Sequence, residues 1–593
     1  MHTSKQAHVK LHDVVRDVAL WIAKEQCQEV LVDNQEISEM LIGNHQSLED
    51  TKAVSLWNLD EDLELSKQLH FPKLEILLLQ PYGFIRDIGA MESLKVLALI
   101  RHGFEWELRR WDPTFCSIPQ SIVSLTNLHT LCLRGKNLGD ISLLGELKGL
   151  EILDLRGSRC DELPTGIVDM KMLKLLDIFG CQIEKSPLEV IGRCEQLEEL
   201  YFWDDKSVIP EILSLSNLKR YVIYDSRLIY EYLDDSFQQY LDGCDEALRA
   251  LCIQGFRVST LNASMKDLIL RANHLWLDNC EWDYKDTNFQ IKHLVVSCCQ
   301  EKRFIIKNPD VNILQTQQGK ENDSAYVGVI AKRFNQLQNE QSLILFLRLK
   351  SLEIERSGKK KGIMEIQVRG RIEDDEESIK AQEPLKLDSE LSELKLDVLP
   401  ELEYIWKGPT QIVSLHRLED ISLTDCPKLK SIFTLAIVAS LPELRRLVVD
   451  NCQEWEGIFC EESLKNLSSS NICFPKLKKI NIYNCNKVRW LLSYSLASHC
   501  PSLEFIYIDS CSEFEGLIGE EAAHGDPLLH DMQDHPQQPL IRNCSELERL
   551  VEEASYGDRL PLLKLKYLRL LSLPKLREIF SHSSHHEIKL EIT

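Results

Sequence analysis

The residue types in this sequence that could perform chemistry are its 19 cysteines and its clustered histidines. Two groups of three histidines stand out: His524, His530 and His535 form one, and His582, His585 and His586 form the other. Neither group has the fixed helical or cysteine/histidine spacing of a metal site. No C-x-x-C pair occurs, so zinc binding and dithiol redox chemistry lack their usual spacing. We expect no metal.

The sequence also lacks the motifs for phosphate binding and for acyl transfer. A phosphate-binding loop needs glycine and lysine followed by serine or threonine. The three candidate pairs, Gly135-Lys136, Gly319-Lys320 and Gly358-Lys359, are followed by Asn, Glu and Lys. No G-x-S-x-G, H-E-x-x-H or kinase motif set is present. We therefore expect no catalytic residues, no cofactor of the chain's own and no enzyme activity.

A leucine pattern organises most of the chain. Apolar residues recur at positions one, four and six of each copy, as in Leu128/Leu131/Leu133, Leu150/Leu153/Leu155 and Leu418/Ile421/Leu423. From Leu128 to Leu218 the steps are 22, 23, 24 and 21 residues, and from Leu391 to Leu503 they are 27, 26, 33 and 26. These periods indicate leucine-rich repeats. The predicted fold is an α/β solenoid, a horseshoe with a concave parallel β-sheet and an irregular or short helical convex side.

Seven cysteines fall at position nine of their copies, where the chain turns inward after the strand: Cys181, Cys280, Cys299, Cys426, Cys452, Cys485 and Cys511. A thiol packs well in such a place. We expect them to be reduced and structural.

Charge limits the classes of partner. The net charge is −24 and the sequence pI is about 5.3. Nucleic acids and anionic membranes both require a positive field, so neither is an expected partner. No apolar run is long enough to span a membrane, and the first residues lack the apolar core of a signal peptide. We expect a cytoplasmic protein, and Lys359–Lys361 leaves a nuclear one open.

Composition and repeat phase divide the chain into six segments. These are an amphipathic helical N-terminal cap (1–49), a first repeat array (50–300), irregular repeats with a charged loop (301–386), a second array (387–516), a polar insertion loop (517–560), and a final repeat with the C-terminal cap (561–593).

Specific phrases resemble one protein family. Val9–Ala23, which contains Leu11-His12-Asp13, is similar to the Met-His-Asp segment that ends the nucleotide-binding region of plant coiled-coil, nucleotide-binding, leucine-rich-repeat disease-resistance receptors. Ile118–Leu128, Leu163–Ile167 and Leu396–Thr410 resemble the repeats of these receptors. The resemblance implies that His12 lies against bound ADP. Without a phosphate loop His12 is interpreted as vestigial, and ADP or ATP is expected only if a nucleotide-binding domain stands upstream.

The predicted recognition site is the outward column of the strands. Position seven presents Arg134, Arg156, Phe179, Trp203 and Tyr224, and position five adds Tyr201 and Trp276; Tyr483 and Tyr507 come from the second array. Exposed aromatic and arginine side chains dominate protein interfaces, so a concave partner-binding face is predicted. The alternative is that these rings stack between neighbouring strands and stabilise the sheet.

The resemblance implies a non-enzymatic sensor of a plant immune receptor. Its expected partners are a pathogen effector or a guarded host protein, together with the nucleotide-binding domain of the same or a related receptor, which the repeats restrain. Two alternatives remain. One is a repeat adaptor that recruits substrates to a ubiquitin ligase, and the other is a free-standing truncated receptor that acts as a scaffold.

Overall fold

The computed structural model describes about half of the chain, in separate segments. They are residues 30–31, 51–56, 71–79, 91–100, 118–203, 215–224, 248–257, 260–281, 290–299, 306–307, 311–312, 348–358, 360–365, 368–369, 387–407, 413–433, 441–459, 474–493, 500–519, 540–545, 547, 567–576 and 589–592. The chain forms two compact units, Met1–Leu275 and Trp276–Thr593, and the division falls within strand β14 (His274–Asp278).

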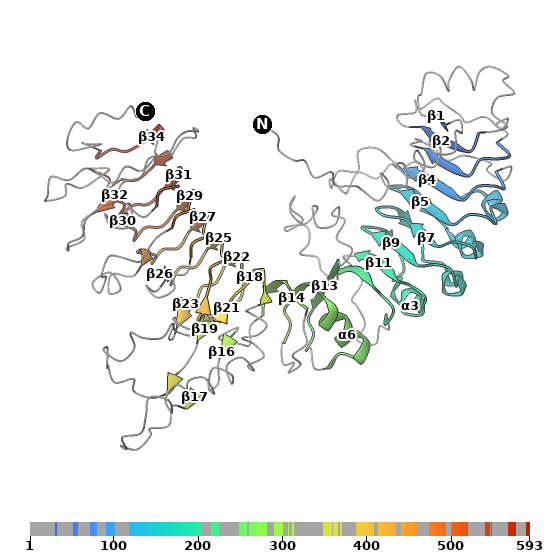
Figure 1. Cartoon of the computed structure of the whole chain (residues 1–593), viewed down its shortest axis with the longest axis horizontal. Coiled ribbons are helices and arrows are strands. Elements are labelled where there is room, and N and C mark those ends of the chain that lie inside the picture. Colours follow the sequence, from blue (N-terminus) through green and yellow to red (C-terminus); the bar gives the residue numbers. More distant parts are fainter. Residues whose placement is uncertain are drawn as a thin grey trace, which may run out of the picture. The chain divides into compact units, whose positions relative to one another are not determined.

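The first unit is built on a stack of parallel strands, one from each repeat (Figure 1). In order of pairing they are β1 (Val30–Leu31), β2 (Ala53–Leu56), β3 (Ile76–Leu79), β4 (Val96–Ile100), β5 (Thr130–Arg134), β7 (Ile152–Asp154), β9 (Leu175–Phe179), β11 (Glu199–Trp203), β12 (Arg220–Tyr224) and β13 (Arg249–Gln254). Every pairing is parallel, because each chain segment returns to the same end of the sheet before the next strand begins.

Short helices and a second ladder make the return path in this unit. The helices are η2 (Gln120–Ser124), η3 (Ser142–Glu146), η4 (Thr165–Asp169), α3 (Leu188–Ile191) and α6 (Ala263–Arg271). The ladder joins β6 (Asn137–Gly139), β8 (Arg159–Cys160) and β10 (Gln182–Ile183). Pro119 and Pro164 immediately precede η2 and η4. Asn262 caps α6 by accepting the Met265 N–H at 2.7 Å.

The second unit repeats this plan. Its parallel strands are β15 (His293–Ser297), β18 (Ser351–Glu355), β22 (Glu393–Asp397), β25 (Asp420–Thr424), β27 (Arg446–Asp450), β29 (Lys479–Tyr483), β31 (Phe505–Asp509), β33 (Leu540–Arg542), β34 (Tyr567–Leu571) and β35 (Lys589–Ile592).

Short parallel ladders form the described part of the return path of this unit. They join β16 (Ile306–Lys307) to β19 (Gly362–Glu365) and β23 (Tyr404–Lys407), β17 (Val311–Asn312) to β20 (Val368–Arg369), β21 (Leu387–Asp388) to β24 (Val413–Ser414), β26 (Ser431–Phe433) to β28 (Gly457–Phe459), and β30 (Trp490–Ser493) to β32 (Gly516–Gly519).

The core consists of the leucines at positions one, four and six. Leu128, Leu131 and Leu133 are 0–1% exposed, and Leu418, Ile421 and Leu423 are equally buried. One repeat cannot bury these side chains alone, whereas stacked repeats bury them continuously. The predicted leucine-rich-repeat solenoid is confirmed.

Where the structure describes it, position eight, directly after the strand, takes a left-handed backbone conformation in both units. The first unit uses glycine, with φ of 69° at Gly135 and 66° at Gly157. The second unit uses mainly Asn, Asp and Ser, such as Asp425 (φ 50°) and Asn451 (φ 51°). Short polar side chains tolerate this conformation, but a β-branched one does not. Val398 (φ 49°) is therefore the strained member of the series.

Position nine holds the buried thiols. All seven predicted cysteines are free and at most 8% exposed. Cys181 Sγ donates to the Leu155 carbonyl at 2.9 Å, which links one repeat to the previous one. Their burial confirms the expected inward, structural position of these thiols.

Two segment predictions need comment. Two parts of the predicted polar insertion loop are strands, so that assignment is wrong: Gly516–Gly519 pairs with β30 as β32, and Leu540–Arg542 pairs with β31 as β33, with Ile541 and Cys544 buried. The leucine triplet is absent from this copy, so the repeat was missed. The N-terminal helix and the six clustered histidines lie outside the described residues, and the remaining domain boundaries stay predictions.

Candidate recognition surface

Positions three, five and seven of each strand point away from the leucine core, and we call this side of the sheet the outward face. Register places Cys132, Asp154, Asp177 and Tyr201 side by side at position five of β5, β7, β9 and β11. Neighbouring parallel strands lie about 4.8 Å apart. Side chains from successive repeats therefore meet directly.

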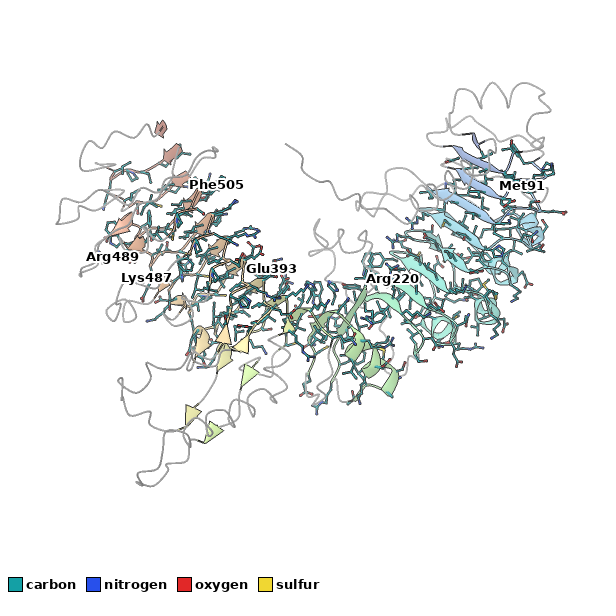
Figure 2. The ribbon with its side chains drawn as sticks, in the orientation of Figure 1. Met91, Arg220, Glu393, Lys487, Arg489 and Phe505 are labelled. Carbon is teal, nitrogen blue, oxygen red and sulfur yellow. The ribbon has the colours of Figure 1, made fainter. Side chains whose placement is uncertain are left out.

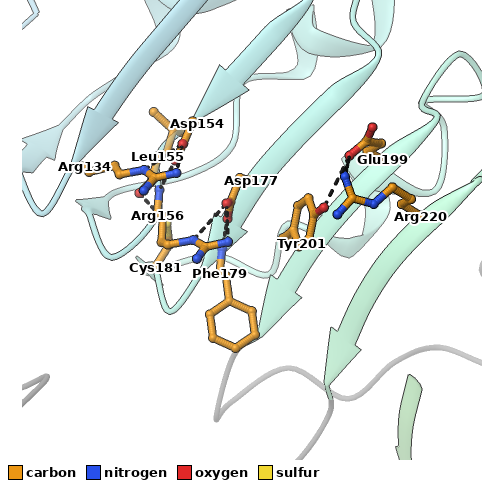
Figure 3. Close-up of polar contacts among 10 residues, drawn as sticks. All are labelled: Arg134, Asp154, Leu155, Arg156, Asp177, Phe179, Cys181, Glu199, Tyr201 and Arg220. Carbon is orange, nitrogen blue, oxygen red and sulfur yellow. Dashed lines mark hydrogen bonds and ion pairs between the residues drawn. The ribbon is translucent and has the colours of Figure 1, made fainter. Parts of the chain in front are cut away.

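Two arginine–aspartate pairs cross this row (Figure 3). Arg134 Nε and Nη2 lie 2.7 and 2.5 Å from Asp154 Oδ2, and Arg156 Nε and Nη2 lie 2.9 and 2.7 Å from Asp177 Oδ2. The other carboxylate oxygens accept the backbone N–H groups of Arg156 and Phe179, each at 3.1 Å. Both aspartate side chains are fully buried, whereas the arginine side chains are 13% and 15% exposed. Each buried charge is thus paired and hydrogen-bonded, as burial requires.

The pairs shape the local electrostatics. Burial raises the pKa of Asp177, and the Arg156 guanidinium opposes that shift. Burial works to lower the pKa of Arg134, but Asp154 outweighs it and the pKa is raised. Burial and the Asp154 charge together raise the pKa of the Cys132 thiol well above its ordinary value. Cys132 is therefore a protonated thiol and a poor nucleophile.

The predicted exposure of the first unit's aromatic residues is wrong. Phe179, Tyr201, Trp203 and Tyr224 are only 1%, 6%, 4% and 4% exposed. The Phe179 and Trp203 ring centroids are 5.6 Å apart, and the Arg156 guanidinium lies 5.7 Å and 5.8 Å from the centroids of Phe179 and Tyr201. Large rings on adjacent strands cover one another at this spacing. The contacts fit the stacking alternative, and a role in partner binding stays a prediction.

The second unit keeps its predicted tyrosines partly exposed. The Tyr483 and Tyr507 ring centroids are 4.9 Å apart at an interplanar angle of 39°. The Arg542 guanidinium lies 5.7 Å from the Tyr507 centroid and 2.7 Å from Asp509 Oδ2. Phe505 and Glu393 lie on the outward side of these strands, opposite Lys487 and Arg489 (Figure 2). Trp276, at the division of the units, is also partly exposed.

The sequence analysis missed the acidic residues of the outward face. Asp154 and Asp177 occupy position five of their repeats, and Asp397 and Asp450 occupy position seven. A carboxylate between the inward leucines, as in Leu153-Asp154-Leu155, was the available signal. It was overlooked because only aromatic residues and arginines were read along these columns.

Within the described residues, no three His, Cys, Asp or Glu side chains are placed to hold a metal ion. Nor does that part of the chain contain a helix long and apolar enough to cross a membrane. His12 lies outside the described residues, so its predicted nucleotide role stays a prediction.

Comparison with known proteins shows what the repeats are similar to. Residues 327–453 match the model of plant disease resistance protein RPS2-like leucine-rich repeats. The resemblance to plant disease-resistance proteins is confirmed. The chain is 30% identical over 207 residues to Disease resistance protein At4g27190 of Arabidopsis thaliana. The aligned region covers 32% of this chain and 19% of that protein. It is 23% identical over 493 residues to Probable disease resistance protein At1g61190, also of Arabidopsis thaliana, covering 80% of this chain and 43% of that protein.

The chain therefore spans less than half the length of these relatives. Among solved structures it is similar to a leucine-rich-repeat protein of Leptospira interrogans, at 16% identity and a TM-score of 0.38 over 74% of this chain and 85% of that one. A plant peptide hormone receptor, RGFR1 in complex with RGF2, matches at 13% identity and a TM-score of 0.33 over 90% of this chain and 78% of that one.

Proposed function

We propose that this chain is the protein-recognition part of a plant disease-resistance receptor, that it senses a pathogen effector or a guarded host protein, and that it acts without catalysis. The observation that carries the proposal is the match of residues 327–453 to disease-resistance repeats. Repeat solenoids expose an extended sheet face on which proteins bind. The partly exposed Tyr483 and Tyr507 lie on that face of the second unit and suit such contacts.

The proposal includes restraint of a nucleotide switch. In this scheme the repeats bind the off state of a nucleotide-binding domain more tightly than its on state, because only differential binding can shift such an equilibrium. ADP or ATP would belong to that domain, and His12 would face the nucleotide only in its company. A cytoplasmic location, with a nuclear one as the variant, follows from this role.

Association in trans tests the proposal. The chain would be expressed in leaves together with the nucleotide-binding part of a related plant disease-resistance receptor, from which that relative's own repeats have been deleted. We expect the two to co-precipitate, and we expect less of the cell death that the unrestrained switch causes. A repeat array of the same length from an unrelated protein is the control. Lack of association, where the relative's own repeats do associate, would refute the proposed restraint.

The ubiquitin-ligase adaptor remains the second candidate. It predicts co-precipitation of ligase subunits with the chain, and the receptor proposal does not. The scaffold alternative predicts partner binding with no effect on a co-expressed switch. The same leaf experiment separates all three roles.

A further inference from the structure

Three aspartates line the carboxyl ends of consecutive strands in the second unit. Asp397 ends β22, Asp425 follows β25, and Asp450 ends β27; we call these residues the acidic row. All three are partly exposed. The register places Tyr483 of β29 directly beside Asp450, so an aromatic ring borders the row.

The row has no ion-pair partner in the part of the chain that the structure describes. Across the described residues no ion pair reaches any of its three carboxylates within 4.0 Å. Their side-chain partners are amides: Asn451 Nδ2 donates to Asp425, and Asn484 Nδ2 donates to Asp450 at 3.4 Å. The other bases of this face stand near different acids. Lys395 Nζ lies 3.3 Å from Glu393 Oε1 and 3.9 Å from Glu353 Oε2. The positive charge of Arg446 opposes the rise in the pKa of Asp420 that burial causes.

The positive charge of Arg356 opposes the rise in the pKa of Asp397. It does not reverse that rise: burial first and Asp425 second still raise the pKa of Asp397. Burial also raises the pKa of Asp450, against the Asn484 hydrogen bond, and Asp425 adds to the increase. The carboxylates thus destabilise one another as anions, and an added cation would relieve them.

Two strands away, on β31, an aspartate and a tyrosine bind an arginine of the chain itself. Arg542 Nη2 and Nε lie 2.7 and 2.8 Å from Asp509 Oδ2, and the guanidinium lies over the Tyr507 ring. Hydrogen bonds from Arg542, Asn543 and Ser510 overcome the effect of burial, and the pKa of Asp509 is lowered. An aspartate beside a tyrosine therefore holds a guanidinium on this face, whereas no described arginine forms an ion pair with Asp450 beside Tyr483.

We propose that the acidic row and Tyr483 form a docking site for an arginine or lysine side chain on an exposed basic segment of the protein partner. The inference rests on the proposed recognition function and specifies the partner's chemistry. Carboxylates supply the charge complement, and the tyrosine face supplies a cation–π contact. Arginine is the preferred occupant because its planar guanidinium can meet a carboxylate and a ring together.

The test uses the purified chain and fluorescein-labelled tetra-arginine, with binding followed by fluorescence anisotropy at low and physiological salt. Tetra-citrulline, which is nearly isosteric and neutral, is the ligand control. We expect Asp425→Asn with Asp450→Asn to weaken tetra-arginine binding roughly tenfold. Tyr483→Leu should weaken it about threefold, and Tyr483→Phe, which keeps the ring, should change it little.

Matched controls separate the site from the net charge of −24. Glu390→Gln with Glu454→Gln removes two exposed charges from the same unit and should alter binding less than about twofold. Thermal unfolding of every variant confirms that it folds. Equal loss in this control pair, equal binding of tetra-citrulline, or no effect of Tyr483→Leu would each overturn the inference. If tetra-arginine binding fails these tests while the nucleotide-binding part still co-precipitates, only the docking site is rejected. If tetra-arginine binds as expected but the nucleotide-binding part does not co-precipitate, only the proposed restraint is rejected.

Discussion

Replacing Arg156 with methionine removes the guanidinium that holds the buried Asp177 carboxylate, while most of the apolar stem remains. Two N–H donors at 2.9 and 2.7 Å are lost, together with the guanidinium contacts on the Phe179 and Tyr201 rings. The hydrogen bond that the Phe179 N–H donates to Asp177 Oδ1 then remains. Removing one partner of a buried ion pair typically costs about 3–5 kcal/mol.

Protonation of Asp177 sets an upper limit to this cost. The ordinary aspartate pKa of 3.8 lies about 3.2 units below pH 7, and one unit corresponds to about 1.36 kcal/mol. Holding the carboxyl neutral at pH 7 therefore costs about 4 kcal/mol. We expect Arg156→Met to lower the free energy of unfolding by about 3–4 kcal/mol at pH 7.

Proton linkage gives the loss a pH dependence. Without its arginine the folded-state pKa of Asp177 rises further above that of the unfolded chain, so the folded state binds more protons. Stability conferred by such a raised carboxyl pKa is present at low pH and is lost as pH rises through the folded-state pKa. The deficit relative to the parent protein should shrink by up to about 1.4 kcal/mol per unit as pH falls from 7 to 5.

Hydrogen exchange of backbone amides in β7, β9 and β11 is the assay, because repeat arrays unfold locally as well as globally. Adding Asp177→Asn to Arg156→Met should recover most of the loss and remove its pH dependence. Lys185→Met, which breaks an ion pair with Glu162 in which the side chains are 74% and 56% exposed, is the control and should show little change. A loss below about 1 kcal/mol that does not vary with pH would refute the electrostatic argument.

Three further outcomes follow from the geometry. Val398→Asn should stabilise the second unit by about 1 kcal/mol in thermal unfolding, because asparagine tolerates a φ of 49° better than valine; an unchanged or lower midpoint would contradict the strain assignment. Trp203→Ala should destabilise the first unit by about 3–5 kcal/mol, since the ring is 4% exposed and packs on Phe179; loss of partner binding at unchanged stability would instead restore the exposed-face interpretation. Iodoacetamide should label Cys298, which is partly exposed, much faster than Cys485, whose burial raises its pKa; equal rates in peptide mass spectrometry would show that position nine opens readily.

Sequence periodicity predicted the strands because the leucine positions must face one core, whatever the loops do. It placed β5, β7 and β9 through Leu131, Leu153 and Leu176, and it missed β33, where only Ile541 and Cys544 keep the pattern. Period alone identifies which side chains face the core. It does not report how deeply the opposite face is covered.

Burial of the outward face depends on contacts between repeats that lie 20 or more residues apart. Arg134 is covered because Asp154 stands at position five of the next strand, and Phe179 is covered in part by Trp203. Reading each column alone made these residues look exposed. Reading adjacent columns together would have paired Arg134 with Asp154 and Arg156 with Asp177 from sequence.

Comparing adjacent columns also shows how the outward faces of the two units differ in charge. In the first unit position seven supplies arginine and position five of the following repeat supplies aspartate, so the charges neutralise each other within the sheet. In the second unit position seven itself carries aspartates, Asp397 and Asp450. Among the described residues, those at position five of the neighbouring strands form no ion pair with these aspartates. An internal ion pair stabilises the fold but leaves little charge for a partner, whereas an unpaired carboxylate on an open strand face keeps its charge available. We therefore expect recognition by charge in the second unit, and we expect the outward face of the first unit to contribute mainly stability.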